Sequence, residues 1–334
     1  MTLPLDPTYQ PMEARPVDSL PQGAAWRYEP KWDGFRCLAF RDRDRVDLRS
    51  KSGQDLARYF PDMVRAMGTL QAQQFVLDGE LVIPVERRLS FEALQLRLHP
   101  AASRVKKLAG EHPALYIAFD LLVDGGGRAL VDCPLAERRR ALEAFFADEP
   151  QAERIRLSPS VADRGEALRW LDELGGDVDG IVAKRDDRPY DTGRRDAMQK
   201  FKRHRTADCV VGGFRYGSRE KLVGSLLLGL YDAAGLLHHV GFTSTLPAAE
   251  KPDLTRRLEA LVEPPGFTGR APGGPSRWST ERSSEWQPLR PELVVEVRYD
   301  HVSDGRFRHG TTLLRWRPDK APRQCGVDQL ARPA

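Results

Sequence analysis

The sequence predicts an α+β protein made of two domains, the second of them a small β-barrel. Its 334 residues are long for one compact domain and sufficient for two. Up to about residue 202, strand-like and helix-like segments alternate along the chain. Beyond His204, short strands follow one another closely with Gly-rich turns between them. We therefore expect one domain at 1–204 and a second at 205–334.

The first domain begins with an extended, Pro-rich segment, residues 1–25, which we expect to lie over the domain surface. After it, apolar–polar alternation predicts strands, and apolar residues at helical spacing predict helices. Ser90 is expected to cap one of these helices. The predicted strands are 28–40, 45–50, 75–84, 114–123, 178–184 and 197–202. The predicted helices are 56–70, 90–98, 134–147 and 163–174.

The second domain carries short strands, one inserted helix and a Pro/Gly-rich loop. Five or so strands with one helix in a segment of this length fit an OB-fold barrel. The connection between the two domains is expected at 203–207. The predicted elements are strands at 209–214, 224–231, 236–243 and 293–299, a helix at 249–262 and the loop at 264–275.

Composition narrows the class of protein without naming a function. The net charge is +4 and the pI is about 8.9, which permits a polyanionic partner but does not require one. The four cysteines are far apart, so they are expected to be packed and reduced. We find no apolar run of membrane-spanning length and no leader-like segment, and therefore expect a cytoplasmic protein.

One octapeptide, Glu29 to Arg36, contains a lysine in an unusual setting. Only 10 of the 52 basic residues are lysines, so arginine supplies most of the positive charge. A lysine can lose its proton and act as a nucleophile, whereas an arginine cannot. Lys31 is therefore a candidate nucleophile, although a surface lysine before the Asp33-Gly34 turn is the simpler explanation of this segment alone.

Charged residues also interrupt segments that otherwise look like strands. Asp78 and Glu80 are two residues apart, so both face the same side of a strand, and burying them is costly without a cation or ligand. Lys200 and Lys202 share a face in the same way. Carboxylates for a metal ion, several cations for phosphates and one nucleophilic amine are the groups that nucleotidyl transfer requires.

Seven segments in order resemble the motifs of the covalent nucleotidyltransferases, and among these the ATP-dependent DNA ligases. The resemblance is greatest to the small bacterial stand-alone C-type ligases, which are related to the end-joining ligase D ligase domain. It implies a nucleotidyltransferase (ATP-grasp-like) adenylation domain with mixed antiparallel sheets, followed by an OB-fold β-barrel. The segments are KWDGFR (31–36), RSKSG (49–53), DGE (78–80), YIAFDLL (116–122), DGIVAK (179–184), QKFK (199–202) and RPDK (317–320).

The resemblance also implies roles around the nucleotide. Lys31 would attack the α-phosphate of ATP, and Phe119 would stack on adenine. Glu80 would hold the ribose hydroxyls and, with Asp179, bind Mg²⁺ (or Mn²⁺). The family usually has glutamate where this chain has Asp179, so the carboxylate here is one methylene shorter. The backbone at Glu29 and Pro30 would contact the adenine edge.

The remaining cations would contact phosphates. Lys184, Lys200 and Lys202 would neutralise those of ATP, and Arg36 and Lys51 would engage AMP or the 5′-phosphate of a DNA nick. Arg317 and Lys320, in the RPDK segment, would act on pyrophosphate when the second domain closes over the nucleotide.

Several of these side chains also have ordinary structural explanations. Phe119 in an apolar strand is a core residue by default, and Arg36 could pair with Asp33. Trp32 is better explained by packing than by ligand binding. The basic runs 106–107 and 138–140 are most simply solvated charge. Four arginines near the last strand either face DNA or pair with nearby acids: Arg306, Arg308, Arg315 and Arg317.

The function implied is the sealing of 5′-phosphate/3′-hydroxyl nicks in duplex DNA, in DNA repair. The expected partners are nicked double-stranded DNA and Ku or other repair proteins, with the chain itself a nucleoid-associated monomer. Three alternatives stay open: an RNA ligase, a GTP-dependent mRNA capping guanylyltransferase, and an OB-fold nucleic-acid-binding protein without catalysis.

Overall fold

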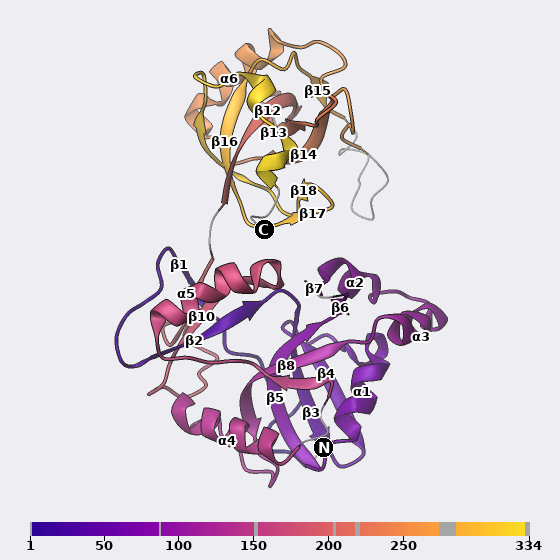
Figure 1. Cartoon of the computed structure of the whole chain (residues 1–334), viewed down its shortest axis with the longest axis vertical. Helices are drawn as coiled ribbons and strands as arrows, with labels where there is room; N and C mark the ends of the chain where they lie inside the picture. The colour runs from indigo at the N-terminus through magenta and orange to yellow at the C-terminus, as the bar shows by residue number, and fades with distance from the viewer. Residues whose placement is uncertain are drawn as a thin grey trace. The chain divides into compact units, whose positions relative to one another are not determined.

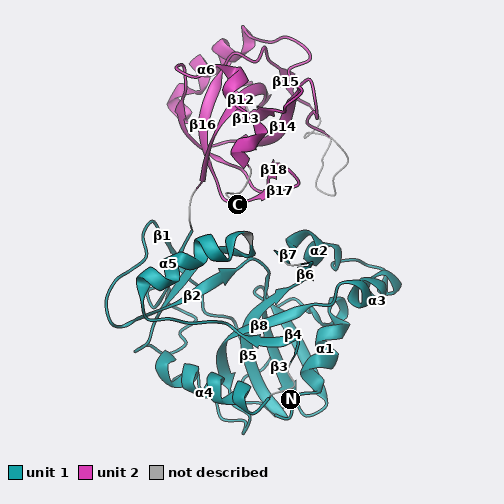
Figure 2. Cartoon of the chain, viewed as in Figure 1, with its two compact units in different colours: residues 1–203 teal, residues 204–334 magenta. Residues whose placement is uncertain are grey.

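The computed structural model describes residues 2–86, 88–149, 153–202, 205–217, 221–273 and 285–330. The chain divides into two compact units, residues 1–203 and 204–334 (Figures 1 and 2). Of the expected connection at 203–207, residues 203 and 204 lie outside the described part. None of the described helices is long and apolar enough to cross a membrane.

Unit 1 contains a five-stranded sheet and a four-stranded sheet, so the predicted α+β class with mixed sheets is confirmed. The larger sheet has the order β4-β3-β5-β8-β9 and the smaller one β1-β11-β10-β2. Its strands are β1 (Arg15–Val17), β2 (Trp26–Trp32), β3 (Phe35–Asp42), β4 (Arg45–Ser50), β5 (Gln74–Val82), β8 (Leu115–Val123), β9 (Ile155–Leu157), β10 (Val178–Arg185) and β11 (Met198–Phe201). A small ribbon joins β6 (Pro84–Val85) to β7 (Arg88–Leu89).

Strand alternation decides which side chains face the space between the two sheets. On β3, Cys37 and Ala39 pack into one apolar cluster, while Leu38 and Phe40 pack into another that also contains Met198 of the smaller sheet. Val76 of β5 belongs to this second cluster. Side chains of the same parity further along β5, those of 78 and 80, therefore point to the same inter-sheet side.

Three helices of unit 1, at 61–68, 135–147 and 164–173, pack against its sheets. Every helix except 102–111 lies where the periodicity predicts one. The predicted helix 56–70 is shorter in the structure, because a 3₁₀ turn at 57–59 precedes Pro61. The Ser90 cap is confirmed, since its side chain accepts a hydrogen bond from the amide of Ala93. The α-helices are α1 (Pro61–Gly68), α2 (Phe91–Leu96), α3 (Ala102–Glu111), α4 (Leu135–Ala147) and α5 (Arg164–Glu173).

Two expectations for unit 1 were wrong. The segment 1–25 is not a mere surface lead-in: β1 joins the smaller sheet as a parallel partner of β11, and Leu3, Leu5 and Met12 are buried. The basic run 138–140 is not a solvated helix face, because the side chains of Arg138 and Arg139 are buried on α4. In contrast, Lys107 is exposed and pairs with Glu111, as solvated charge should.

Unit 2 is an antiparallel sheet of order β14-β13-β12-β16-β19, with β15 paired to β12. A bridge between Thr243 and Thr311 joins the two edges of this sheet, as the predicted barrel requires. The predicted loop 264–275 is described as far as residue 273. The elements are β12 (Arg205–Tyr216), β13 (Val223–Tyr231), β14 (Leu237–Thr243), α6 (Lys251–Glu259), β15 (Gln287–Pro288), β16 (Val294–Tyr299), β17 (Val302–Ser303), β18 (Arg306–Phe307) and β19 (Thr312–Trp316).

Candidate active site

A cavity of about 650 Å³ opens beside the inter-sheet cluster of unit 1. This volume lies within the usual range for small-molecule sites. Nine of the predicted site residues line it: Glu29, Pro30, Lys31, Arg36, Lys51, Glu80, Phe119, Lys184 and Lys200.

Lys31 lies on β2 opposite an irregularity in β10. Along this ladder Val178 pairs with Trp32 and Gly180 pairs with Lys31, so Asp179 is an extra residue in a β-bulge. A bulge redirects the side chain it contains. The Asp179 carboxylate lies 2.8 Å from Lys31 Nζ and 3.1 Å from Lys202 Nζ.

The two lysines decide the ionisation of Asp179. Burial alone would raise the pKa of this carboxyl, but the charges of Lys31 and Lys202 outweigh it and hold the pKa well below its usual range. Asp179 is therefore a carboxylate at neutral pH and the counter-ion of Lys31. Gly180 is required here, because a Cβ would lie 2.0 Å from the carbonyl oxygen of Phe201.

Glu80 is the second carboxyl at the cavity, and its environment has the opposite effect. Burial raises its pKa to about 8, and the charges of Lys31 and Arg36 only partly offset this. Glu80 follows Gly79, where a Cβ would lie 2.5 Å from the Tyr116 ring. Burial thus favours the protonated form of Glu80.

Arg36 pairs with Asp78, not with Asp33 as the alternative explanation supposed. Its Nε and Nη2 donate to the two oxygens of Asp78 at 3.1 and 2.7 Å. Asp78 is fully buried and also accepts a 2.7 Å hydrogen bond from the Tyr190 hydroxyl. Asp78 therefore orients Arg36, while Glu80 on the same face lines the cavity.

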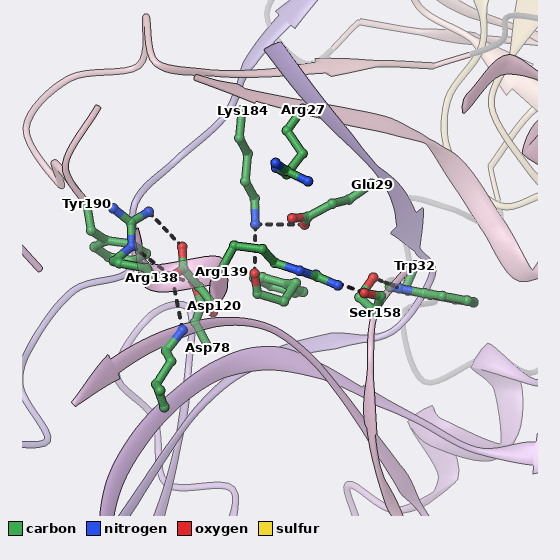
Figure 3. A network of polar contacts seen from close by, with 12 residues as sticks. Arg27, Glu29, Trp32, Asp78, Asp120, Arg138, Arg139, Ser158, Lys184 and Tyr190 are labelled. Atoms are coloured by element: carbon green, nitrogen blue, oxygen red, sulfur yellow. Dashed lines mark hydrogen bonds and ion pairs between the residues drawn. The ribbon is translucent and has the colours of Figure 1, made fainter. Parts of the chain in front are cut away.

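At another side of the cavity, Phe119 lies beside a buried ion pair. Lys184 Nζ contacts the Glu29 carboxylate (Figure 3), with 2.7 Å between Nζ and Oε2. The same Nζ lies 4.5 Å from the centre of the Phe119 ring. Phe119 is itself an extra residue in a bulge, since Ala118 pairs with Gly79 and Asp120 with Asp78. The bulge turns Phe119 toward the cavity instead of the core.

The Glu29 side chain has an unused acceptor. Its Oε1 is buried and has no hydrogen-bond partner in the described part of the chain. A buried acceptor without a partner costs free energy, which a ligand donor would recover. Burial raises the pKa of Glu29, and Lys184 partly offsets this shift.

A second buried ion pair lies beneath this one. Arg138 Nε and Nη2 donate to Asp120 at 2.8 and 2.9 Å, and the guanidinium stacks over Tyr190 (Figure 3). Burial would raise the pKa of Asp120, but the charge of Arg138 lowers it. The pair thus connects α4 to the strand that carries Phe119. Trp32, expected to pack, does so partly: its indole donates to Ser158 and its ring also lines the cavity.

Several lining residues were missed from the sequence. Glu13, beside β1, pairs with Lys51 at 2.7 Å and also with Arg195. Val182 and Met198 add apolar surface to the wall. Glu13 could be identified as a cavity residue only from its ion pairs in the structure, because nothing in the Pro-rich segment distinguishes it.

The predicted site residues Arg317 and Lys320 lie in unit 2. Both pair there with Asp208, an acid that the sequence did not single out. Among the arginines near the last strand, Arg315 pairs with Glu296 and Arg317 with Asp319. Of the two explanations given for these arginines, DNA contact or pairing with nearby acids, Arg315 and Arg317 fit the second.

The donor set fits a divalent cation only in part. Among the residues that the structure describes, no three His, Cys, Asp or Glu side chains come together to hold a metal. Mg²⁺, however, commonly uses one or two carboxylates together with substrate phosphates. Asp179 and Glu80, both close to Lys31, are suited to that kind of binding.

Comparison with known proteins bears directly on this arrangement. Residues 11–202 match the model of the ATP dependent DNA ligase domain, and residues 219–320 match that of the ATP dependent DNA ligase C terminal region. The chain belongs to the ATP-dependent DNA ligases. This confirms the family that the seven motifs predicted, and disfavours the capping-enzyme, RNA-ligase and non-catalytic alternatives.

Among curated ligases, DNA ligase C2 of Mycolicibacterium smegmatis is 44% identical over 100% of this chain and 97% of its own length. DNA ligase C of Mycobacterium tuberculosis is 42% identical over 100% of this chain and 96% of its own. The solved ligase domain of M. tuberculosis LigD has a TM-score of 0.50 at 29% identity, covering 96% of this chain and 98% of the other.

Proposed function

We propose that this ligase seals 5′-phosphate/3′-hydroxyl nicks in duplex DNA through an adenylylated Lys31 (EC 6.5.1.1). The observation that carries the proposal is the position of Lys31: it lines a nucleotide-sized cavity and its amine touches a carboxylate fixed by a bulge. Lys31 Nζ attacks the α-phosphorus of ATP, forming a P–N bond, losing a proton and releasing pyrophosphate.

Two further transfers complete the reaction. An oxygen of the 5′-phosphate at the nick attacks the phosphorus of the lysyl adenylate, so Lys31 is released and AMP joins the DNA end. The 3′-hydroxyl then attacks the 5′-phosphorus, forms the new phosphodiester with loss of its proton, and releases AMP. Cationic side chains offset the phosphate charge during each transfer. We assign this to Arg36, Lys51, Lys184, Lys200 and Lys202, and during the first transfer also to Arg317 and Lys320.

The environment of Lys200 suits that task. Burial lowers its pKa, and the neighbouring charges of Lys31 and Lys51 lower it further. Positively charged side chains that lie close together create a positive potential, which attracts a polyphosphate. Lys200 is thus expected to lie near the phosphates of bound ATP.

The Glu29 side chain gives a reason for using ATP. We place the adenine ring against Phe119, with its edge toward Glu29 and Pro30. The amino group at C6 of adenine is a donor that can satisfy Glu29 Oε1, whereas guanine has a carbonyl oxygen at C6 and would place acceptor against acceptor. Glu80 is placed to accept hydrogen bonds from the ribose hydroxyls when it is ionised.

We expect Asp179 and Glu80 to bind Mg²⁺ (or Mn²⁺) together with the nucleotide phosphates. A cation bound there would supply positive charge close to the reacting phosphate. On the partner side, we propose a monomer that acts on nicked double-stranded DNA in the bacterial cytoplasm and nucleoid. Ku or other repair proteins are proposed partners, by similarity to relatives named for non-homologous end joining.

The test combines labelling with sealing. Wild-type protein is incubated with ATP or GTP labelled at the α-phosphate, and then with nicked duplexes that contain only DNA or carry RNA at the nick. We expect covalent labelling by ATP alone and sealing of the DNA nick. Labelling by GTP would favour a guanylyltransferase, and a strict need for RNA at the nick would favour an RNA ligase.

A further inference from the structure

Arg317 and Lys320 share one carboxylate in unit 2. Arg317 Nη1 donates to Asp208 Oδ1 at 2.8 Å, and Lys320 Nζ donates to Asp208 Oδ2 at 2.7 Å. Each oxygen of the carboxylate thus holds a different cation. This fixes the distance between the two positive charges, because the two oxygens belong to one rigid group.

The backbone brings both cations to the same acid. Residues 317–320 form a turn closed by a 3.2 Å hydrogen bond from the Lys320 amide to the Arg317 carbonyl. Pro318 occupies the second position of this turn, where its fixed φ is favourable. Asp319 turns back onto Arg317 and accepts from its Nε and Nη2. Arg317 therefore contacts Asp208 and Asp319 closely and Glu296 at 4.0 Å, whereas Lys320 contacts Asp208.

Asp208 itself is rigidly placed. It lies within β12, paired with Glu296 of β16. The Gln329 side chain binds its backbone on both sides, accepting from the Asp208 amide at 3.0 Å and donating to the Asp208 carbonyl at 3.1 Å. The Asp208 side chain is 12% exposed, whereas the side chains of Arg317 and Lys320 are 18% and 23% exposed. A fixed acid thus lies under two partly exposed cations.

We propose that Asp208 is a positioning residue for the adenylylation of Lys31: it presents Arg317 and Lys320 as one preorganised pair for pyrophosphate. This rests on the proposed role of those two cations. Long Arg and Lys side chains lose much rotamer freedom when they are ordered, and a carboxylate that orders them in advance reduces that cost on binding. Partly exposed ion pairs contribute little to folding, so their arrangement is better explained by positioning.

The inference is tested with Asp208→Asn, which keeps the shape but removes the charge, and Asp208→Glu, which keeps the charge. Asp253→Asn is the matched control, because it removes the same charge from an exposed ion pair of the same unit. The rate of Lys31 labelling is measured over a range of ATP concentrations, and sealing of a pre-adenylylated nick is measured without ATP.

For Asp208→Asn we expect kcat/KM for labelling to fall by about tenfold or more, since misplaced groups cost this much or more in rate. Sealing of the pre-adenylylated nick should stay close to wild type, and Asp208→Glu should recover most of the labelling. Labelling by Asp208→Asn equal to that of Asp253→Asn would overturn the inference. So would an equal loss of labelling and sealing together with a lowered Tm, because that result indicates a purely structural role.

The double variant Arg317→Ala/Lys320→Ala separates this inference from the function on which it rests. If the double variant labels normally, the role of the two cations in adenylylation is wrong, and the role of Asp208 falls with it. If the double variant loses labelling while Asp208→Asn does not, only the role of Asp208 is wrong. Loss in both, with sealing of the pre-adenylylated nick retained, supports both.

Discussion

Lys31 Nζ lies 2.8 Å from Asp179 Oδ2, and the carboxylate is there because β10 has one residue more than β2 at that point. The same carboxylate holds Lys202. The Asp179 carboxylate, one methylene shorter than the glutamate of the family motif, therefore forms ion pairs with both Lys31 and Lys202. The bulge redirects the side chain of this aspartate, whose carboxylate contacts Lys31.

Replacing Lys31 should abolish covalent labelling by ATP. Both Lys31→Ala and Lys31→Arg should give no labelled protein, because neither side chain offers a free amine to the α-phosphorus. Lys107→Ala is the control, since Lys107 is exposed and pairs only weakly with Glu111 at 3.7 Å. Labelled protein in the Lys31→Ala variant would show that another residue is the nucleophile.

Removing the charge of Asp179 should be nearly as damaging. In Asp179→Asn the counter-ion of Lys31 and Lys202 is lost, and we expect labelling to slow by about a hundredfold, as when one electrostatic group is removed from an active site. Asp179→Glu should retain more activity than Asp179→Asn. Rates of single-turnover labelling measure this, and equal rates in the two variants would show that the charge is not what matters.

The raised pKa of Glu80 predicts a pH-dependent change in stability. The folded protein holds this proton up to about pH 8, whereas an unfolded chain releases it near pH 4.5, so stability falls as pH rises between these values. Glutamine does not ionise in this pH range, so the Glu80→Gln variant should not show this loss of stability. Without nucleotide, its Tm relative to wild type should be similar near pH 4.5 and should rise toward pH 8.5, by about 2–4 °C for each kcal/mol recovered.

A matched comparison follows from the difference between Arg138 and Arg140. Arg138→Ala leaves Asp120 as an unpaired buried carboxylate, so we expect a loss of about 3–5 kcal/mol in the free energy of unfolding. Arg140 is exposed on the same helix, and Arg140→Ala should change stability by no more than about 0.5 kcal/mol. Urea unfolding of both variants measures the difference, and similar losses would contradict the buried ion pair.

Deleting residues 207–334 should separate the first transfer from the last. The truncated protein lacks Arg317 and Lys320, so we expect it to lose labelling by ATP. It should still seal a pre-adenylylated nick at a reduced rate, because Lys31, Glu80 and Asp179 remain. Labelling at the wild-type rate by the truncated protein would show that the second unit has no part in adenylylation.

Much of this architecture could be predicted from the sequence, because strands and helices leave a periodic apolar pattern. The parity of Asp78 and Glu80 correctly placed both on one face of β5. The motif order correctly predicted the ligase family, while the nucleophilic role of Lys31 stays a prediction. Neither inference required knowledge of distant contacts.

What could not be predicted depends on irregularity and on contacts between distant segments. The bulges at Phe119 and Asp179 are visible only from strand register, since an extra residue leaves no mark on the apolar pattern. Arg138 looked solvated because helix periodicity alone cannot show that Asp120 faces it. Asp208 directly precedes the predicted strand 209–214, and only its contacts with the distant residues Arg317 and Lys320 identify it.

The parallel pairing of β1 with β11 has a consequence for synthesis. β1 leaves the ribosome before β11, its partner, which is made only after most of unit 1. Contacts between such distant segments form late in folding, because a long loop must close first. Glu13 lies just before β1 and Lys200 lies in β11, and both line the cavity. A nascent ligase therefore has no complete nucleotide site until residue 201 has emerged, and ATP can stabilise only chains that have passed this point.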